Sequence, residues 1–351
     1  MKDKIKILFF LPSFAGGGAE KVTITFINNL PFEDYEVHLT VLNSEGKLKN
    51  TLNKDIILHD LKTKRLRYGF VKIIKNINYV NPNVIFSTFI NLNIFLLFCK
   101  LFYKKIKFVI RAENVPSKHF NFLPYSKFYK ILYYILYKKS DILIASCQTI
   151  YDEFSKCGIE IKKLKLVPNP VENIFLLNKN KIIRKKGEGI RLVAVGRLAE
   201  QKGYDYLLEV ISKVKSQIHC TILGEGILEK KLKDLSNKLN INHKVDFKGY
   251  VEDPYPYLNG ADALLITSNF EGLPNAALES LSLGTPVIAT PTSGGLRELK
   301  NVTIVEKGDN FVNAVNDIKI NKNSYKSTLL DKKFNVEDVM FTLCQIFENN
   351  L

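Results

Sequence analysis

Tryptophan is absent from this sequence of 351 residues, and only two methionines and five cysteines occur. The cysteines are odd in number and form no Cys-x-x-Cys pair, which argues against a disulfide framework and favours reduced thiols in a cytoplasmic protein. The five histidines are scattered, with no spacing typical of a metal site. No run of about 18 apolar residues exists, so no transmembrane helix is predicted. We interpret the short apolar stretch that ends at Pro12 as a first buried strand and not as a signal peptide.

Composition and charge narrow the class of protein. Hydrophobic residues make up 46% and charged residues 25% of the chain, which excludes a disordered chain, a collagen-like chain and a small disulfide scaffold. The length allows two domains, each with its own core. Lys and Arg total 51 against 35 Asp and Glu, for a net charge of +16. Such a surplus favours anionic partners, namely nucleic acid, anionic lipid headgroups or phosphorylated substrates.

Strand-like apolar runs alternate with helix-length amphipathic segments, the pattern of an α/β protein with parallel sheets. Five helices are expected in the first half, at Ala19–Leu30, Gly69–Val80, Asn91–Phe102, Tyr125–Lys139 and Thr149–Cys157. The expected strands are Ile5–Leu11, Glu36–Leu42, Ile56–Leu61, Asn83–Thr88, Lys107–Arg111, Asp141–Ser146, Ile190–Val195, Cys220–Leu223, Val245–Lys248, Ala263–Thr267, Pro286–Ala289 and Val302–Val305.

A linker is predicted in the middle of the chain, where the two prolines of Val167–Pro170 precede a basic polar stretch. We therefore predict two doubly wound Rossmann-like domains, at residues 1–170 and 190–330, with the linker at 171–189 and a last segment at 331–351. Ligands of such sheets bind outside the C-terminal ends of the strands, so we expect a ligand between the two domains.

The loop after the first strand contains three consecutive glycines, Gly16, Gly17 and Gly18, at the start of a helix. Glycines let the backbone approach a ligand closely, and the free N–H groups and helix dipole favour an anion. The loop has neither the third glycine of a Gly-x-Gly-x-x-Gly fingerprint nor a Walker lysine. A plain flexible turn is the alternative interpretation.

The strand that begins the second half runs into Gly196 and Arg197, and Lys202 follows at the mouth of the next helix. Two fixed cations at the C-terminal end of a strand are suited to clamp a diphosphate. The alternative is a pair of solvated charges.

Two acids lie within Thr267–Ser280: Glu271 precedes a helix, and Glu279 lies one to two turns inside it, with Pro274 suited to the first turn. We expect both carboxylates to point into one cleft at different depths. Carboxylates accept hydrogen bonds from hydroxyls, so the pair suits a ligand with polyol rings at both ends, and the helix N-terminus between them favours phosphate. The alternative is a first-turn acid that satisfies the dipole beside a surface glutamate.

The pattern Gly-Arg-x-x-x-x-Lys-Gly followed by Glu-Gly-x-x-x-x-x-x-Glu resembles the retaining nucleotide-sugar glycosyltransferases of family four, which have the two-domain GT-B fold. The resemblance runs from Gly16–Glu20 through Gly284–Val287 to Gly294–Glu298. Phe334–Phe347 resembles the terminal helix of the family, which crosses back to the first domain.

The resemblance implies a role for each matching position. Arg197 and Lys202 would hold the donor diphosphate and stabilise the departing nucleoside diphosphate. Glu271 would bind hydroxyls of the transferred sugar, and Glu279 would accept from the ribose hydroxyls. The implied donor-binding set is Gly196, Arg197, Lys202, Tyr250, Val251, Glu271, Gly272, Leu273, Pro274, Asn275 and Glu279, with Glu271, Arg197 and Lys202 as the catalytic residues. Gly16, Gly17 and Gly18 would lie near the donor phosphates or the acceptor.

Family members need no metal, and the sequence has no Asp-x-Asp motif, so no cofactor is expected. The positive charges of Arg197 and Lys202 would replace a divalent ion. A front-side, ion-pair-like route would let the leaving phosphate act as the base. Many members place a histidine after the strand that corresponds to Lys107–Ile110. This chain departs from that pattern, and Arg111, Glu113 and Asn114 are the candidates for a contact from the first domain.

The segment from Lys100 to Lys139 holds ten Lys and Arg, six Tyr and five Phe, against one acid. On a helix, Lys127, Lys130, Tyr134, Tyr137 and Lys138 share one face, and Phe128, Leu132, Ile135 and Leu136 share another. Lysine with tyrosine suits an anionic headgroup layer, which predicts contact with the inner face of the cytoplasmic membrane and a lipid-linked acceptor. A solvated lysine face over an ordinary core helix is the alternative.

We therefore predict a retaining, metal-independent glycosyltransferase that moves a hexose or N-acetylhexosamine from a nucleoside-diphosphate donor to a glycan or polyprenol-linked acceptor in surface polysaccharide synthesis. A protein that binds polyanions without catalysis is one alternative, although no helix-turn-helix, RNA-recognition or zinc motif occurs, and no nucleic-acid partner is expected. A nucleotide-sugar epimerase is another.

Overall fold

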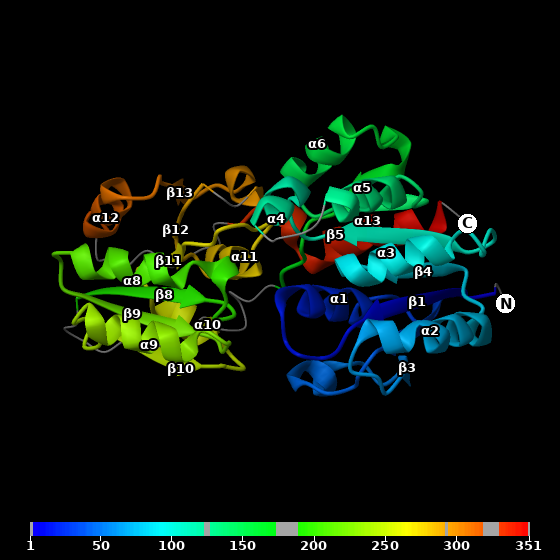
Figure 1. Ribbon diagram of the computed structural model, residues 1–351, viewed down its shortest axis with the longest axis horizontal. Coiled ribbons are helices and arrows are strands. Elements are labelled where there is room, and N and C mark those ends of the chain that lie inside the picture. The colour runs from blue at the N-terminus through cyan, green and yellow to red at the C-terminus, as the bar shows by residue number, and fades with distance from the viewer. Residues whose placement is uncertain (1–2, 123–126, 173–188, 292–293, 319–329, 350–351) are drawn as a thin grey trace. The chain divides into compact units, whose positions relative to one another are not determined.

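Two wholly parallel sheets organise the chain, which confirms the predicted class of two doubly wound Rossmann-like halves (Figure 1). The computed structural model describes residues 3–122, 127–172, 189–291, 294–318 and 330–349. One unit comprises Met1–Pro170 with Val336–Leu351, and the other comprises Val171–Asn335. Most of the predicted linker, residues 173–188, lies outside the described residues.

The sheet of the first unit has the strand order β3-β2-β1-β4-β5-β6-β7. The chain therefore adds strands on one side of β1 and then reverses direction, and this reversal between β1 and β4 is the topological switch point of the sheet. The strands are β1 (Ile5–Leu11), β2 (Tyr35–Val41), β3 (Ile57–Asp60), β4 (Val84–Ser87), β5 (Lys107–Ala112), β6 (Ile142–Ala145) and β7 (Leu164–Leu166).

Alternation along β1 assigns its side chains to two cores. Ile7, Phe9 and Leu11 pack in one buried cluster, and Leu8 and Phe10 pack in another. This is the period-two pattern of a strand that is buried on both faces. The first cluster includes residues of α1 and α13, and the second includes residues of α2 and α3. The helices of this unit are α1 (Gly18–Asn28), α2 (Leu66–Val80), α3 (Ile90–Cys99), α4 (Pro116–Phe122), α5 (Lys127–Tyr137), α6 (Gln148–Lys156) and α13 (Val336–Glu348).

Helix α13 belongs to the first unit although it comes last in the sequence. Leu343 is fully buried in the cluster of β1 and α1. The ring of Phe347 lies 6.3 Å from that of Phe9 and 6.2 Å from that of Tyr35, in edge-to-face arrangements. The terminal helix therefore completes the core of the first unit.

The faces of α5 differ from those predicted. Tyr137, expected on the lysine face, is fully buried, and its hydroxyl accepts a hydrogen bond from Asn93 Nδ2 at 2.9 Å. Phe128 and Ile135, expected on the opposite face from the lysines, are 73% and 50% exposed. The prediction was wrong here because the helix buries Tyr137 against Asn93 of α3 and Phe154 of α6 and leaves Phe128 and Ile135 exposed.

The second unit repeats the doubly wound order, as β10-β9-β8-β11-β12-β13, with its switch point between β8 and β11. Its strands are β8 (Ile190–Val195), β9 (Ile218–Leu223), β10 (Val245–Gly249), β11 (Ala263–Ile266), β12 (Val287–Ala289) and β13 (Val302–Ile304). Its helices are α8 (Tyr204–Lys213), α9 (Glu229–Lys238), α10 (Tyr255–Gly260), α11 (Asn275–Ser282) and α12 (Asp309–Asn316).

Candidate active site

The switch point of the second unit brings two of the predicted residues together. Strands β8 and β11 are hydrogen-bonded neighbours, so the loops that follow them leave the sheet at the same edge. The loop after β8 carries Lys202, and the loop after β11 carries Glu271. In sheets of this type the switch point is the place where ligands bind.

Lys202 and Glu271 form an ion pair in which Nζ lies 2.5 Å from Oε1. The hydroxyl of Ser268 donates to the same carboxylate oxygen at 3.0 Å. The two charged side chains are 21% and 9% exposed, so water screens the pair only in part. The site therefore holds a cation and an acid in fixed positions, which suits recognition of a phosphate beside a hydroxyl-bearing ring.

The two loops are held to each other by several hydrogen bonds. Thr267 Oγ1 donates to the carbonyl of Lys202 at 3.1 Å, and the amide N–H of Asn269 donates to the carbonyl of Gln201 at 2.7 Å. These contacts hold the backbones of the two loops together. The distance between Lys202 and Glu271 is therefore set by the loops as well as by the lysine side chain.

Two glycines make this arrangement possible. Gly196 has φ +154°, and a Cβ there would lie 2.7 Å from Lys202 Cε. Gly203 has φ +60°, and a Cβ there would lie 2.4 Å from the carbonyl oxygen of Thr267. A side chain at position 203 would collide with backbone, whereas one at position 196 would push the lysine aside.

Tyr204 stabilises the loop after β8. Its side chain is buried, and its hydroxyl donates to the carbonyl of Gly196 at 3.3 Å. Burial and the nearby Glu271 carboxylate raise the pKa of this hydroxyl well above its usual range, so it stays a neutral donor.

The other predicted donor-binding residues have different environments. Arg197 is exposed and forms no ion pair with any residue of the described part of the chain. Glu279 is 8% exposed within α11, whose N-cap is Pro274. The loop before α11 is largely buried: Gly272, Leu273 and Pro274 are buried and Asn275 is half-buried. We therefore expect it to contact a ligand through backbone groups more than through side chains.

Tyr250 and Val251 follow β10, two strands away from β8. The amide N–H of Tyr250 donates to Glu225 Oε1 at 3.3 Å. Glu225 follows Gly224, where a Cβ would lie 2.0 Å from the carbonyl oxygen of Gly196. The loop after β9 thus links the loops after β8 and β10. Neither this loop nor Ser268 was among the residues predicted from the sequence. The run Gly224-Glu225-Gly226 directly after a strand was the sequence pattern that could have indicated the loop after β9.

The switch point of the first unit carries the glycine loop. Gly16 has φ +94°, Gly17 is the N-cap of α1, and α1 begins at the exposed Gly18. The amide groups of the first helical turn are therefore positioned near the C-terminal ends of β1 and β4.

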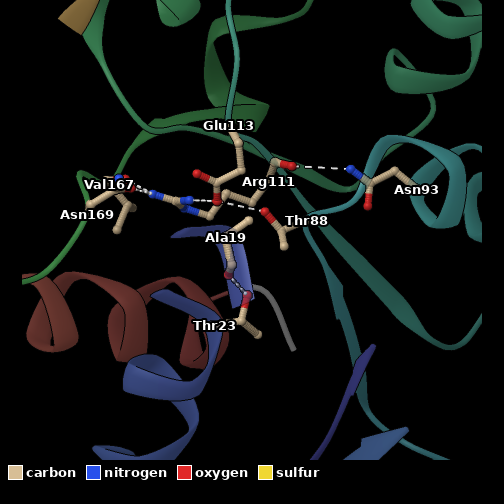
Figure 2. Close-up of polar contacts among 8 residues, drawn as sticks. All are labelled: Ala19, Thr23, Thr88, Asn93, Arg111, Glu113, Val167 and Asn169. Carbon is tan, nitrogen blue, oxygen red and sulfur yellow. Dashed lines mark hydrogen bonds and ion pairs between the residues drawn. The ribbon is translucent and has the colours of Figure 1, made fainter. Parts of the chain in front are cut away.

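Arg111, at the end of β5, is fully buried and is bound inside the unit (Figure 2). Its Nη1 forms an ion pair with Glu113, and its Nη2 donates to Asn169 Oδ1 at 2.6 Å and to the carbonyl of Val167 at 3.3 Å. The guanidinium also lies 5.3 Å from the ring centre of Phe26. Burial lowers the pKa of Arg111 from its ordinary value to about 9.

Glu113 is 16% exposed and lies where β5 has ended. Its Oε1 receives both the guanidinium of Arg111 and the hydroxyl of Thr88, the latter at 2.7 Å (Figure 2). Asn114 beside it is half-buried. Of the three candidates predicted after β5, Arg111 therefore has its charge occupied internally, while Glu113 and Asn114 reach the surface.

Comparison with known proteins agrees with this geometry. The family described as Glycosyltransferase Family 4 matches residues 16–173, and that described as Glycosyl transferases group 1 matches residues 178–328. The chain belongs to the group 1 glycosyltransferases. It is therefore an enzyme of the GT-B fold class, as the motifs predicted.

This group 1 glycosyltransferase is similar to two relatives and one solved structure that we describe in turn. The N-acetylgalactosamine-N,N'-diacetylbacillosaminyl-diphospho-undecaprenol 4-alpha-N-acetylgalactosaminyltransferase of Campylobacter jejuni is 28% identical over 84% of this chain and 83% of its own length. A 41.2 kDa protein of the Klebsiella pneumoniae cps region is 31% identical over 76% of each chain. The structure of Anabaena HepE in complex with UDP-glucose is 17% identical, with a TM-score of 0.79 over 98% of this chain and 100% of HepE.

Two further features concern metal binding and membrane spanning. Among residues 3–122, 127–172, 189–291, 294–318 and 330–349, no group of three or more His, Cys, Asp or Glu side chains could hold a metal ion. Within the same ranges, no helix of the glycosyltransferase combines the length and the hydropathy needed to span a bilayer.

Proposed function

We propose that this glycosyltransferase moves a hexose or N-acetylhexosamine from a nucleoside-diphosphate donor to a lipid-linked glycan acceptor, with retention at the anomeric carbon, in synthesis of a bacterial surface polysaccharide or glycan. The observation that carries the proposal is the ion pair of Lys202 and Glu271 at the switch point of the second unit. HepE, which has the same fold, is known in complex with UDP-glucose, which supports a nucleoside-diphosphate sugar as the donor.

The donor would be bound through the residues around that pair. Lys202 and the exposed Arg197 bind the diphosphate, and the negative charge that grows on the leaving group strengthens both contacts in the transition state. Glu271 accepts hydrogen bonds from hydroxyls of the transferred sugar. Glu279 accepts from the ribose, and backbone at Tyr250 and Val251 lines the base.

The reaction would need no protein nucleophile. The bond between the anomeric carbon and the phosphate oxygen breaks, the acceptor hydroxyl attacks from the same face, and its proton passes to the departing phosphate. Lys202 and Arg197 would supply the positive charge that a divalent ion supplies elsewhere, so we expect no metal requirement. The Gly16–Gly18 loop and Asn114 would line the acceptor side.

The acceptor is proposed to be lipid-linked on two grounds. The Campylobacter relative is named for an acceptor carried on diphospho-undecaprenol. The first unit also exposes apolar side chains on α5, next to exposed lysines, which we name the apolar patch. It consists of Phe128, Ile131 and Ile135; Phe98 on α3 and Leu101 and Phe102 just after α3 are exposed as well.

The apolar patch has the chemistry of a surface that lies on an anionic membrane. Its α5 residues recur at three- and four-residue spacing and are 73%, 59% and 50% exposed, in that order along the helix. Lys127 at the start of this helix and Lys138 directly after its end are exposed too, and they can reach headgroup phosphates. We place the enzyme on the inner face of the cytoplasmic membrane for this reason.

A donor panel tests the proposal. Purified enzyme is incubated with UDP- and GDP-linked hexoses and N-acetylhexosamines, and thermal shift, release of nucleoside diphosphate and transfer to polyprenol-diphosphate glycans are measured. We expect one donor class to stabilise the protein and to support transfer, and Glu271→Ala to abolish most of that transfer. Interconversion of the sugar nucleotide without acceptor would indicate an epimerase. Salt-sensitive binding of any polyanion, with no effect of sugar nucleotides, would contradict catalysis.

A further inference from the structure

We propose that Glu113 binds a sugar hydroxyl of the substrate through its free carboxylate oxygen, and that Arg111 is the positioning residue that holds Glu113 in place. The inference rests on the proposed function and deepens it. It assigns different roles to two residues that the sequence presented as equivalent candidates.

The first argument is the way in which the carboxylate is held. Arg111 and Thr88 both bind Oε1 of Glu113, and no residue of the described ranges donates a hydrogen bond to Oε2 (Figure 2). A carboxylate fixed by one oxygen and open at the other is prepared to accept a hydrogen bond at a defined position.

The second argument is location. Thr88 follows β4 and Glu113 follows β5, and these two strands are neighbours on one side of the switch point. Glu113 therefore lies at the edge of the sheet where ligands of doubly wound folds bind. Its strand β5 neighbours β4, and β4 neighbours β1, which leads into the glycine loop.

The third argument is that Arg111 cannot itself reach a ligand. Its side chain is 0% exposed, and its two terminal nitrogens bind Glu113, Asn169 and the carbonyl of Val167. Keeping an arginine wholly buried is costly unless the charge is paired, so the pairing with Glu113 has to be maintained for the unit to fold well. The contacts from Arg111 and Thr88 hold the Glu113 carboxylate in one orientation.

The ligand chemistry follows from the acceptor-only character of a carboxylate. It takes a hydrogen bond from a hydroxyl and disfavours a phosphate, so the group recognised is a sugar hydroxyl. The hydroxyl could belong to the transferred sugar or to the acceptor glycan, and kinetics separates these two sources.

The test compares Glu113→Gln with a matched control, Glu153→Gln. Glu153 is another carboxylate of the first unit that is held by hydrogen bonds, from Ser117 at 2.7 Å and Tyr134 at 2.8 Å. We expect Glu113→Gln to lower Tm, because it removes the counter-charge of the buried Arg111. In assays well below that Tm it should also lose about 10- to 100-fold in kcat/KM, since one hydrogen bond to a charged group is lost. Glu153→Gln should retain wild-type kinetics.

Hydrolysis of the donor without acceptor identifies the source of the hydroxyl. If Glu113 binds the transferred sugar, Glu113→Gln slows both this hydrolysis and transfer. If it binds the acceptor, hydrolysis and the KM for donor stay unchanged while the KM for acceptor rises. Both outcomes support the proposal.

The role of Arg111 is tested by a double-mutant cycle. Arg111→Met alone should lower Tm and activity because it leaves the Glu113 carboxylate without its counter-charge, and Arg111→Lys should recover part of the activity. In the Glu113→Gln background, Arg111→Met should reduce kcat/KM little further, because Arg111 acts through Glu113. A merely structural arginine would lower kcat/KM by the same factor in both backgrounds.

Two results would overturn the inference. One is an active wild-type enzyme whose Glu113→Gln variant has unchanged kcat and unchanged KM for both substrates. The other is full additivity in the double-mutant cycle. A wild-type enzyme that neither hydrolyses nor transfers any sugar of the panel is a different result, since it would refute the proposed function itself and this inference with it.

Discussion

Lys202 Nζ and Glu271 Oε1 lie 2.5 Å apart although 69 positions separate the two residues in the chain. The contact exists because β8 and β11 are neighbours in the sheet while two strands and three α-helices separate them in the sequence. The cation that we assign to the diphosphate and the acid that we assign to the sugar are thus held at bonding distance.

Replacement of each partner should affect different steps. We expect Lys202→Met to weaken binding of the nucleoside diphosphate and to lower kcat/KM by about 10²- to 10³-fold, because a charge that stabilises the leaving group is lost. Glu271→Gln should lower transfer while leaving the affinity for the nucleoside diphosphate near that of wild type. Calorimetric titration with UDP and GDP, together with kinetics, measures both effects.

Lys233→Met is the matched control, since Lys233 forms a 2.7 Å ion pair with Glu229 on α9, far along the sequence from the loops of the site. Equal loss of nucleotide affinity in Lys202→Met and Lys233→Met would contradict the assignment.

Gly196 should matter for activity more than for folding. An added methyl would lie 2.7 Å from Lys202 Cε, the movable end of a long side chain, so we expect Gly196→Ala to displace the lysine and to reduce activity strongly. Gly308→Ala is the control, because Gly308 also has a positive φ, of +103°, but no heavy atom lies within 4 Å of its added Cβ. Both variants carry backbone strain, so both should lower Tm, and only Gly196→Ala should lower kcat/KM by more than its change in Tm explains.

The sequence located the strands well because each is a short apolar run bounded by turn residues. Ile5–Leu11 and Ile190–Val195 are the bounds found in the structure. β7 was missed because Leu164–Leu166 is three residues long and its middle residue is a lysine. The GT-B class was implied by the resemblance of the motifs to the family-four glycosyltransferases.

Side-chain environment was harder to predict than secondary structure. The face of α5 that is buried depends on which side α3 supplies Asn93 as a partner for Tyr137, and periodicity within α5 does not contain that information. Arg111 was predicted as a candidate for a ligand contact from the first domain, yet it is buried and binds Asn169, which lies 58 positions later in the chain. Such pairings arise from topology and not from local pattern, so the candidate site residues remain predictions that mutagenesis has to test.

Acid should destabilise the first unit through its paired histidines. His38 Nδ1 and His59 Nε2 lie 2.9 Å apart, and the two rings are stacked. Burial, and then the positive charge of a protonated His38, lower the pKa of His59 below its ordinary value of 6.5. Between that lowered pKa and 6.5 the unfolded chain binds more protons than the folded one, so stability falls as the pH drops below about 6.5.

The measurement is Tm against pH from 7.5 to 5. We expect the wild type to lose Tm toward pH 5, and His59→Gln to show a shallower loss because it removes one titrating group. His243→Gln is the control, since His243 is exposed in the second unit. Identical slopes in all three proteins would show that the stacked pair does not contribute to the acid sensitivity.

Membrane binding should depend on the apolar patch and on the lysines around it. We expect the enzyme to sediment with vesicles that contain phosphatidylglycerol and to remain free with neutral vesicles, and high salt should weaken the binding. Ile131→Ser combined with Ile135→Ser should reduce binding, because two exposed aliphatic side chains lose their contact with lipid. Ile227→Ser is the control, as Ile227 is 93% exposed in the second unit. Binding that is lost equally in both proteins would argue against this surface.

Helix α13 should be required for the stability of the first unit alone. Leu343 is fully buried against the cluster that contains Phe9 and Phe26, so Leu343→Ala leaves a cavity and should cost about 2–5 kcal/mol of unfolding free energy. Phe341, two residues earlier on the same helix, is 67% exposed, and Phe341→Ala should change stability by about 0.5 kcal/mol or less. Hydrogen exchange localises the effect: amides of β1 and β2 should exchange faster in Leu343→Ala, while those of β8 and β9 keep their wild-type protection. Uniform loss of protection in both sheets would instead mean that the two units unfold as one.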